Sequence, residues 1–153
     1  MVNLNLIQVL FDKTRNRVKY FLGGKVALDT DSASIKRIDC SGFTRWILAR
    51  ASEQKLILPD GSQNQLSFAR AHWRKLEQYS DVKFAGKDPS RLFIGFLSPK
   101  PGKAWPRHVW LLRSNGVNMR TLESHGSGGV NARPWDTNAL RGCKECFEIP
   151  LDT

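Results

Sequence analysis

The chain has 153 residues, a length typical of a single domain with its own hydrophobic core. Its 24 Lys and Arg residues outnumber 14 Asp and Glu residues, and the resulting net charge of +10 favours anionic partners such as nucleic acid, a membrane surface or a bacterial envelope. The composition, 41% hydrophobic and 25% charged, excludes disordered and collagen-like chains. No apolar stretch reaches the roughly 18–20 residues of a membrane span, and the N-terminus lacks a secretory signal pattern.

The first half of the chain predicts helices. Apolar residues recur at helical spacing over residues 5–18, before Gly23 and Gly24 interrupt the pattern. The Asp and Ser residues within 25–37 are typical of a loop. A second helix is predicted over 41–50, and a third begins at Ser62, whose hydroxyl suits an N-cap.

The second half predicts antiparallel strands. Residues 91–97 form a dense apolar run, and 108–112, 117–124 and 146–151 are further strand candidates. Asn115-Gly116, between two of them, is a strong hairpin signal. Helices followed by strands predict one α+β domain over residues 1–153, with its N-terminal helices packed on an antiparallel sheet.

The three cysteines are an odd number, which argues against a disulfide framework. Cys143 and Cys146 form a C-x-x-C pair, which is half of a zinc site. Because no second half follows at a suitable spacing, we interpret both as packing or exposed thiols and predict no metal.

Cys40 has a different setting, at the predicted start of the second helix. The helix macrodipole and the unpaired N–H groups of the first turn favour a thiolate there, and the same N–H groups suit an oxyanion. The alternative is that Cys40 is a small buried hydrophobic residue. Position alone does not separate these two interpretations.

A thiol nucleophile needs a base, usually an imidazole, and a group that orients it. His72 lies off the apolar face of the third predicted helix and is expected to be a surface residue. His108 opens an apolar strand, where a polar side chain needs a partner or a function. His108 is therefore the histidine whose partner we look for; the alternative is a surface His–Glu pair, which the apolar strand disfavours.

The hairpin suggests the partner of His108. A turn centred on Asn115-Gly116 sets Ser114 opposite Val117, and this register sets Glu123 opposite His108, with Cβ atoms roughly 4.5–5.5 Å apart. His125 lies on the same face, at the diagonal position. The register favours Glu123 as the orienting group and leaves His125 as the alternative.

Several segments resemble those of the NlpC-type, papain-like bacterial cell-wall peptidases. Asp39-Cys40-Ser41-Gly42-Phe43 resembles the nucleophile motif of that family. The flanking matches follow in the family's order: Tyr20-Phe21-Leu22-Gly23-Gly24, with Leu22 in place of Trp; residues 58–65, similar to Leu-Pro-Arg-x-Ser-x-x-Gln; and His108-Val109-Trp110, where the family has His-Val-Gly. The matched segments span about residues 20–135.

The resemblance implies a papain-like fold and hydrolysis of amide bonds in peptidoglycan stem peptides. It makes Cys40 the nucleophile and His108 the base, and Glu123 matches the third polar position, where the family more often has His, Asn or Gln. Residues that match substrate-contacting positions are Tyr20, Asp39 and Ser41. The implied chemistry needs no metal or cofactor, the implied partner is the anionic cell wall, and we expect a monomer.

The absence of a signal peptide and of wall-binding repeats leads us to expect a bare catalytic domain, made in the cytoplasm and delivered to the wall by a phage or prophage lysis or tail system. One alternative is a basic nucleic-acid-binding module, in which Trp and Phe stack on bases. Core-like spacing of the aromatic residues and the lack of a nucleic-acid motif count against it. The other alternative is a papain-like acyltransferase or amidase with a non-wall substrate.

Overall fold

The structure is a computed structural model, and it describes residues 1–76, 87–98, 106–135 and 143–151. The helices among these residues are α1 (Leu4–Thr14), α2 (Cys40–Ala51), α3 (Ser62–His72) and the short 3₁₀ helix η1 (Ser32–Ser34). The strands are β1 (Lys19–Tyr20), β2 (Arg37–Ile38), β3 (Arg74–Leu76), β4 (Leu92–Ser98), β5 (His108–Ser114), β6 (Met119–His125), β7 (Gly129–Asn131) and β8 (Cys143–Ile149). None of the helices in the described ranges is long and apolar enough to cross a membrane.

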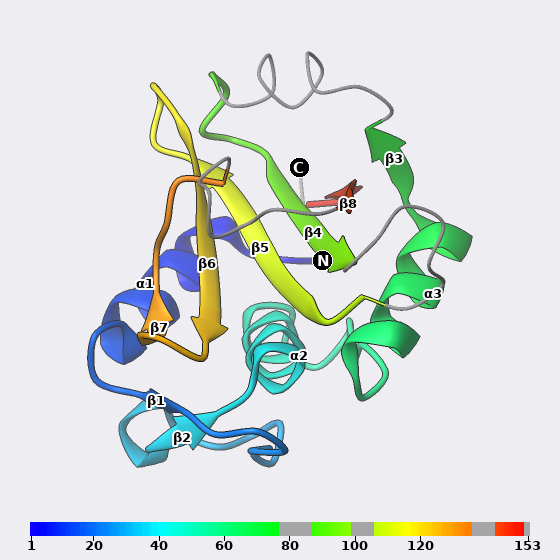
Figure 1. Ribbon diagram of the computed structural model, residues 1–153. Coiled ribbons are helices and arrows are strands. Elements are labelled where there is room, and N and C mark those ends of the chain that lie inside the picture. Colours follow the sequence, from blue (N-terminus) through cyan, green and yellow to red (C-terminus); the bar gives the residue numbers. More distant parts are fainter. Residues whose placement is uncertain (77–86, 99–105, 136–142, 152–153) are drawn as a thin grey trace.

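Six strands form one antiparallel sheet in the order β3-β8-β4-β5-β6-β7. Helix α2 packs against β5 and β6, and α1 packs against α2 (Figure 1). β1 and β2 pair in parallel as a separate two-stranded ribbon that leads into α2. The predicted α+β architecture, helices against an antiparallel sheet, is confirmed.

Both faces of the central sheet are buried. Phe43 and Ile47 of α2 meet Ile94, Val109 and Leu111 in the larger hydrophobic core. Alternate strand residues point to the opposite face, where a second core contains Phe93, Leu97, Trp110, Leu112, Trp135 and Cys146. All seven residues of β4 are therefore buried, which explains its continuous apolar sequence.

The structure corrects the ends of two predicted helices. Helix α1 ends at Thr14 and not at the predicted residue 18. At this end the Thr14 hydroxyl donates to the carbonyl of Leu10, and the chain becomes extended at Arg15. Helix α3 is capped by Gly61 without a side-chain bond, so the prediction of Ser62 as N-cap is wrong. The Ser62 hydroxyl instead donates to the carbonyl of Pro106, two residues before His108 (3.2 Å).

The predicted hairpin register is also wrong, by two residues. Ser114 lies opposite Met119. The connection is the four-residue loop 115–118, in which the Asn115 side chain accepts from the backbone N–H groups of Val117 and Asn118. Continued to the start of β5, this register sets His125, not Glu123, opposite His108. An even shift keeps every side chain on its predicted face.

Candidate active site

Cys40 is the first residue of α2 and is 7% exposed. Asp39 caps the helix, and its carboxylate accepts from the backbone N–H of Gly42 (2.6 Å). The thiol therefore lies at the positive end of the α2 dipole, beside first-turn N–H groups that have no intrahelical partner.

Two glycines allow the chain to pack tightly around this helix start. A Cβ on Gly42 would lie 2.9 Å from the carbonyl oxygen of Gly24, and a Cβ on Gly24 would lie 2.8 Å from that of Phe21. The Gly24 carbonyl in turn accepts from the backbone N–H of Asp39 (2.9 Å). Because neither glycine has a Cβ, the chain at Gly24 can pack directly against the start of α2, next to Cys40.

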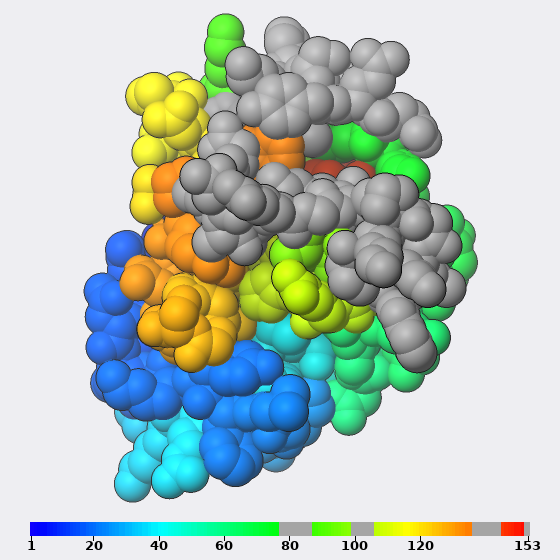
Figure 2. Space-filling model, viewed as in Figure 1, coloured from blue at the N-terminus to red at the C-terminus, as the bar shows by residue number. Residues whose placement is uncertain are grey.

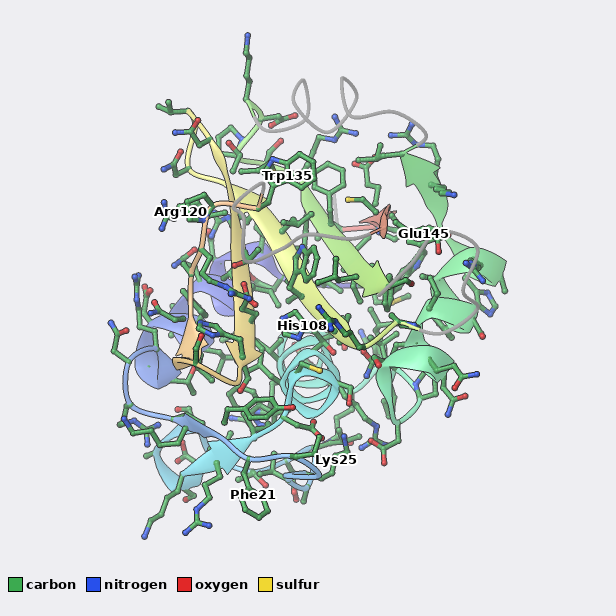
Figure 3. All side chains as sticks on the ribbon, viewed as in Figure 1. Phe21, Lys25, His108, Arg120, Trp135 and Glu145 are labelled. Atoms are coloured by element: carbon green, nitrogen blue, oxygen red, sulfur yellow. The ribbon has the colours of Figure 1, made fainter. Side chains whose placement is uncertain are left out.

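His108 is the first residue of β5, and this end of the strand lies near α2 (Figure 3). Its Nε2 lies 2.7 Å from Oε1 of Glu123, and its ring packs against Trp110 at a centroid distance of 5.5 Å. Since Nε2 faces Glu123, Nδ1 is the ring nitrogen left for Cys40. Glu123 itself is fully buried, with 0% exposure.

The ionisation of this pair follows from its partners. Burial favours neutral His108, but side-chain hydrogen bonds with Cys40 and Glu123 outweigh it and raise the pKa of His108 to about 9. Burial likewise favours protonated Glu123, but hydrogen bonds from His108 and Arg133 hold its pKa at about 2. Glu123 is thus a carboxylate at neutral pH, and the Cys40 and Glu123 side chains together favour protonated His108.

Arg133 and Thr121 complete the surroundings of Glu123. Nη2 and Nε of Arg133 lie 2.5 and 3.1 Å from the two carboxylate oxygens, and the Thr121 hydroxyl donates to Oε2. Our sequence analysis missed both residues. Thr121 shares the face of Glu123 by strand alternation, which was a usable signal, but no spacing rule connects Arg133 to this site.

His125, the alternative third residue, makes no hydrogen bond with His108. Its Nδ1 lies 3.0 Å from the Ser127 hydroxyl. Its Nε2 is buried and finds no hydrogen-bond partner within the described part of the chain. Burial, together with the charge of Arg133, lowers the pKa of His125 and favours the neutral ring. The structure therefore places the carboxylate of Glu123, and neither ring nitrogen of His125, in hydrogen-bond contact with His108.

Comparisons by sequence found no relative: no protein-family model matches the chain, and no curated protein does. Solved structures do match. The P60 domain of an antigen from M. avium subspecies paratuberculosis is 22% identical, over 95% of this chain and 91% of that one, with a TM-score of 0.57. The chain has the NlpC/p60 fold.

Two M. tuberculosis proteins with this fold differ in their described activity. The peptidoglycan hydrolase RipB is 20% identical over 96% of this chain and 63% of its own, with a TM-score of 0.58. RipD is 17% identical over 97% and 96%, with a TM-score of 0.57, and is described as a non-catalytic NlpC/p60 domain protein adapted to peptidoglycan binding. The NlpC/p60 fold by itself is therefore compatible with catalysis and with binding alone.

Asp39 and Ser41, expected to contact substrate in the NlpC/p60 fold, already have an internal partner. The Lys25 ammonium lies 2.9 and 2.7 Å from the two Asp39 carboxylate oxygens and 2.9 Å from the Ser41 hydroxyl. Both residues are buried, at 5% and 4% exposure. A substrate would have to displace Lys25 before it could reach them.

Tyr20, the third expected contact residue, is placed differently. It lines a cavity of about 260 Å³ together with His108, and the turn at Gly126 and Ser127 forms another wall. This turn lies next to the β1 segment on the molecular surface (Figure 2). Burial, with the charges of Cys40 and Asp39, raises the pKa of Tyr20. Tyr20 is therefore the expected contact residue that the structure leaves open toward the cavity.

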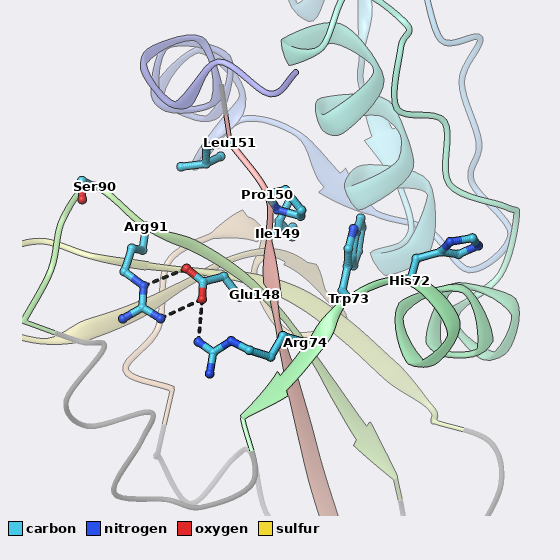
Figure 4. A pocket seen from close by; sticks show the side chains of 9 residues that line it. All are labelled: His72, Trp73, Arg74, Ser90, Arg91, Glu148, Ile149, Pro150 and Leu151. Carbon is cyan, nitrogen blue, oxygen red and sulfur yellow. Dashed lines mark hydrogen bonds and ion pairs between the residues drawn. The ribbon is translucent and has the colours of Figure 1, made fainter. Parts of the chain in front are cut away.

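A second cavity, of about 340 Å³, lies between the C-terminal end of β8 and β3 (Figure 4). It contains Glu148 with Arg74 and Arg91. Cys146, on β8, faces the second core, where burial raises its pKa to about 12, so that it stays a thiol. The Cys143 side chain lies outside the described residues, and among those described no three metal-ligating side chains are grouped to hold an ion.

Proposed function

We propose that this chain is a thiol peptidase that hydrolyses amide bonds in peptidoglycan stem peptides. The observation that carries the proposal is the connected set of Cys40, His108 and Glu123 at the start of α2, within an NlpC/p60 fold. Two structures with this fold, RipB and SagA, are described as peptidoglycan hydrolases. The excess of positive charge suits an anionic wall.

The proposed mechanism is acyl transfer to sulfur. His108 accepts the Cys40 proton, and the thiolate attacks the carbonyl carbon of the scissile amide. First-turn N–H groups of α2 stabilise the resulting oxyanion. His108 then donates its proton to the leaving amine, and afterwards takes one from the water that hydrolyses the thioester. Glu123 keeps the imidazole oriented and stabilises its charged form throughout.

Digestion of purified peptidoglycan tests the proposal, with released fragments identified by mass spectrometry. Wild type is expected to create new peptide termini, which also identify the bond cut, while Cys40→Ala creates none. Cys146→Ala is the matched thiol control and is expected to keep the activity, because Cys146 lies in the second core.

Other outcomes favour the alternatives. Intact peptidoglycan that nevertheless retains the protein would indicate a binding role like that described for RipD. Modified but uncleaved amines or lipids would indicate an acyltransferase, and salt-sensitive nucleic-acid binding that survives Cys40→Ala would indicate the basic module. Delivery by a phage or prophage system and the monomeric state remain predictions.

A further inference from the structure

The geometry points to Arg133 as a positioning residue of this site, acting through Glu123: its guanidinium keeps the buried carboxylate ionised and directed at His108. This inference rests on the proposed function for its meaning, since it concerns the orienting member of the same catalytic set. Arg133 also lines the cavity beside Tyr20 and His108, but the role inferred here comes from its contact with Glu123 and not from contact with substrate.

Each carboxylate oxygen of Glu123 has two hydrogen-bond partners. Oε1 receives His108 Nε2 and Arg133 Nη2, while Oε2 receives Arg133 Nε and the Thr121 hydroxyl. A guanidinium that binds both oxygens in this way fixes the plane of the carboxylate as well as its position. The oxygen that faces His108 is therefore held from the opposite side by Arg133.

The backbone also anchors Arg133. Its N–H donates to the Thr121 hydroxyl (2.9 Å), and its carbonyl accepts from the Thr121 N–H (2.7 Å). Thr121 thus contacts both the carboxylate and the main chain that carries the guanidinium. This double contact places Arg133 beside β6 although the residue lies beyond the regular pairing of β7.

Charge balance gives Arg133 its effect on the base. With Cys40 as thiolate, His108 protonated, Glu123 ionised and Arg133 charged, the four groups have no net charge. Without Arg133 the same state leaves a net negative charge next to a fully buried carboxylate, which is costly. The other titratable or charged groups beside Cys40 and His108 are the Asp39–Lys25 pair, Tyr20 from β1, His125 from β6 and Arg107 before β5.

The rate of Cys40 alkylation by iodoacetamide, followed against pH by peptide mapping, tests this directly. For Arg133→Met we expect the acid limb of the profile to move up by about one pH unit, so that alkylation at a pH on that limb slows about tenfold. Arg133→Lys keeps the charge but not the two-point contact, and its profile should lie much closer to wild type. Met and Lys both keep an unbranched side chain in place of the guanidinium, so a packing effect alone would not separate them.

The control is Arg120→Met, which removes the same charge from the far end of β6 (Figure 3) and should leave the profile unchanged. A double-mutant cycle asks whether Arg133 acts through Glu123: in a Glu123→Gln background, Arg133→Met should shift the profile clearly less. A folded Arg133→Met variant with a wild-type profile would overturn the inference. So would an equal shift from Arg120→Met, or an undiminished shift in the Glu123→Gln background.

Alkylation needs no peptidoglycan, so the two proposals fail separately. If wild type leaves the wall intact but Arg133→Met moves the profile, the positioning role stands and the proposed substrate is wrong. If Arg133→Met does not fold by near-ultraviolet circular dichroism, Arg133→Gln, which also removes the charge, takes its place. An acid limb moved up by about one pH unit in Arg133→Gln supports the inference, and a folded Arg133→Gln variant with a wild-type profile overturns it.

Discussion

Two regions of the molecule contain the same residue types, a cysteine, a glutamate and arginine, yet only one has the arrangement that the proposed catalysis requires. Near α2, Cys40 and Glu123 meet opposite sides of His108, and Arg133 supports the carboxylate. On β8, Cys146 and Glu148 lie on the same face of the strand, but Cys146 is packed in the second core, and Glu148 is 25% exposed and paired with Arg74 and Arg91. The proposed reactivity thus depends on an imidazole between thiol and carboxylate, and not on residue composition.

The largest expected difference between the regions is in thiol reactivity. With a pKa of about 12, only about one Cys146 in 10⁵ is thiolate at pH 7. We expect iodoacetamide to modify Cys40 at least about 10³-fold faster than Cys146 in the native protein, because Cys40 has a base beside it and the thiolate is the reactive form. Mass spectrometry of the modified peptides measures both rates in one sample. Equal alkylation rates of Cys40 and Cys146 in the native protein would contradict the assignment of Cys40 as nucleophile.

The two glutamates should differ next. Glu123→Ala is expected to lower kcat/KM on peptidoglycan by about 10²–10³-fold, since His108 loses the group that orients it and stabilises its charge. Glu148→Ala removes a carboxylate from a partly exposed arginine pair and should stay within about twofold of wild type. Release of soluble wall fragments measures both. Similar losses in the two variants would mean that folding, and not His108, explains the effect.

Acid stability sharpens the comparison. The pKa of Glu123 is lowered from 4.5 to about 2 in the folded state, so its contribution is present above the unfolded value and is lost as the pH falls through about 2. Between pH 5 and pH 2 we expect wild type to lose up to about 3 kcal/mol of unfolding free energy through this group. Glu123→Gln should flatten that part of the urea-unfolding profile, whereas Glu148→Gln should flatten it less. A profile for Glu123→Gln as steep as wild type would rule out this contribution.

The smallest expected effect belongs to the exposed arginine of the β8 region. Arg74 is paired with Glu148 at 2.7 Å, but its side chain is 65% exposed. We expect Arg74→Ala to change the free energy of unfolding by less than about 0.5 kcal/mol, and any change to shrink further in high salt. Urea unfolding at low and high salt measures it. A loss above 1 kcal/mol would show that this pair is less screened than its exposure indicates.

Local patterns in the sequence were enough to predict much of the site. The start of α2 at Cys40 follows from Asp39, a strong N-cap residue, and from the apolar spacing behind it. His108 at the start of β5 follows from the continuous apolar run of residues 109–112. Glu123 was selected from a wrong register but on the correct face, because a shift of two residues preserves strand parity. Its long side chain reaches His108 from the diagonal position.

The sequence by itself therefore determined the order and type of the three long helices and the four long strands, the place of Cys40 at a helix start, and the shared strand face of His108 and Glu123, because periodicity and capping act over a few residues. It did not predict the short strands β1, β2, β3 and β7. Only the tertiary structure decided which of Glu123 and His125 is hydrogen-bonded to His108, where Arg133 lies, and that the Lys25 ammonium binds Asp39 and Ser41. These contacts join separate segments of the chain. They depend on how the β5–β6 loop closes and on which buried charges must be paired, and no local pattern encodes either.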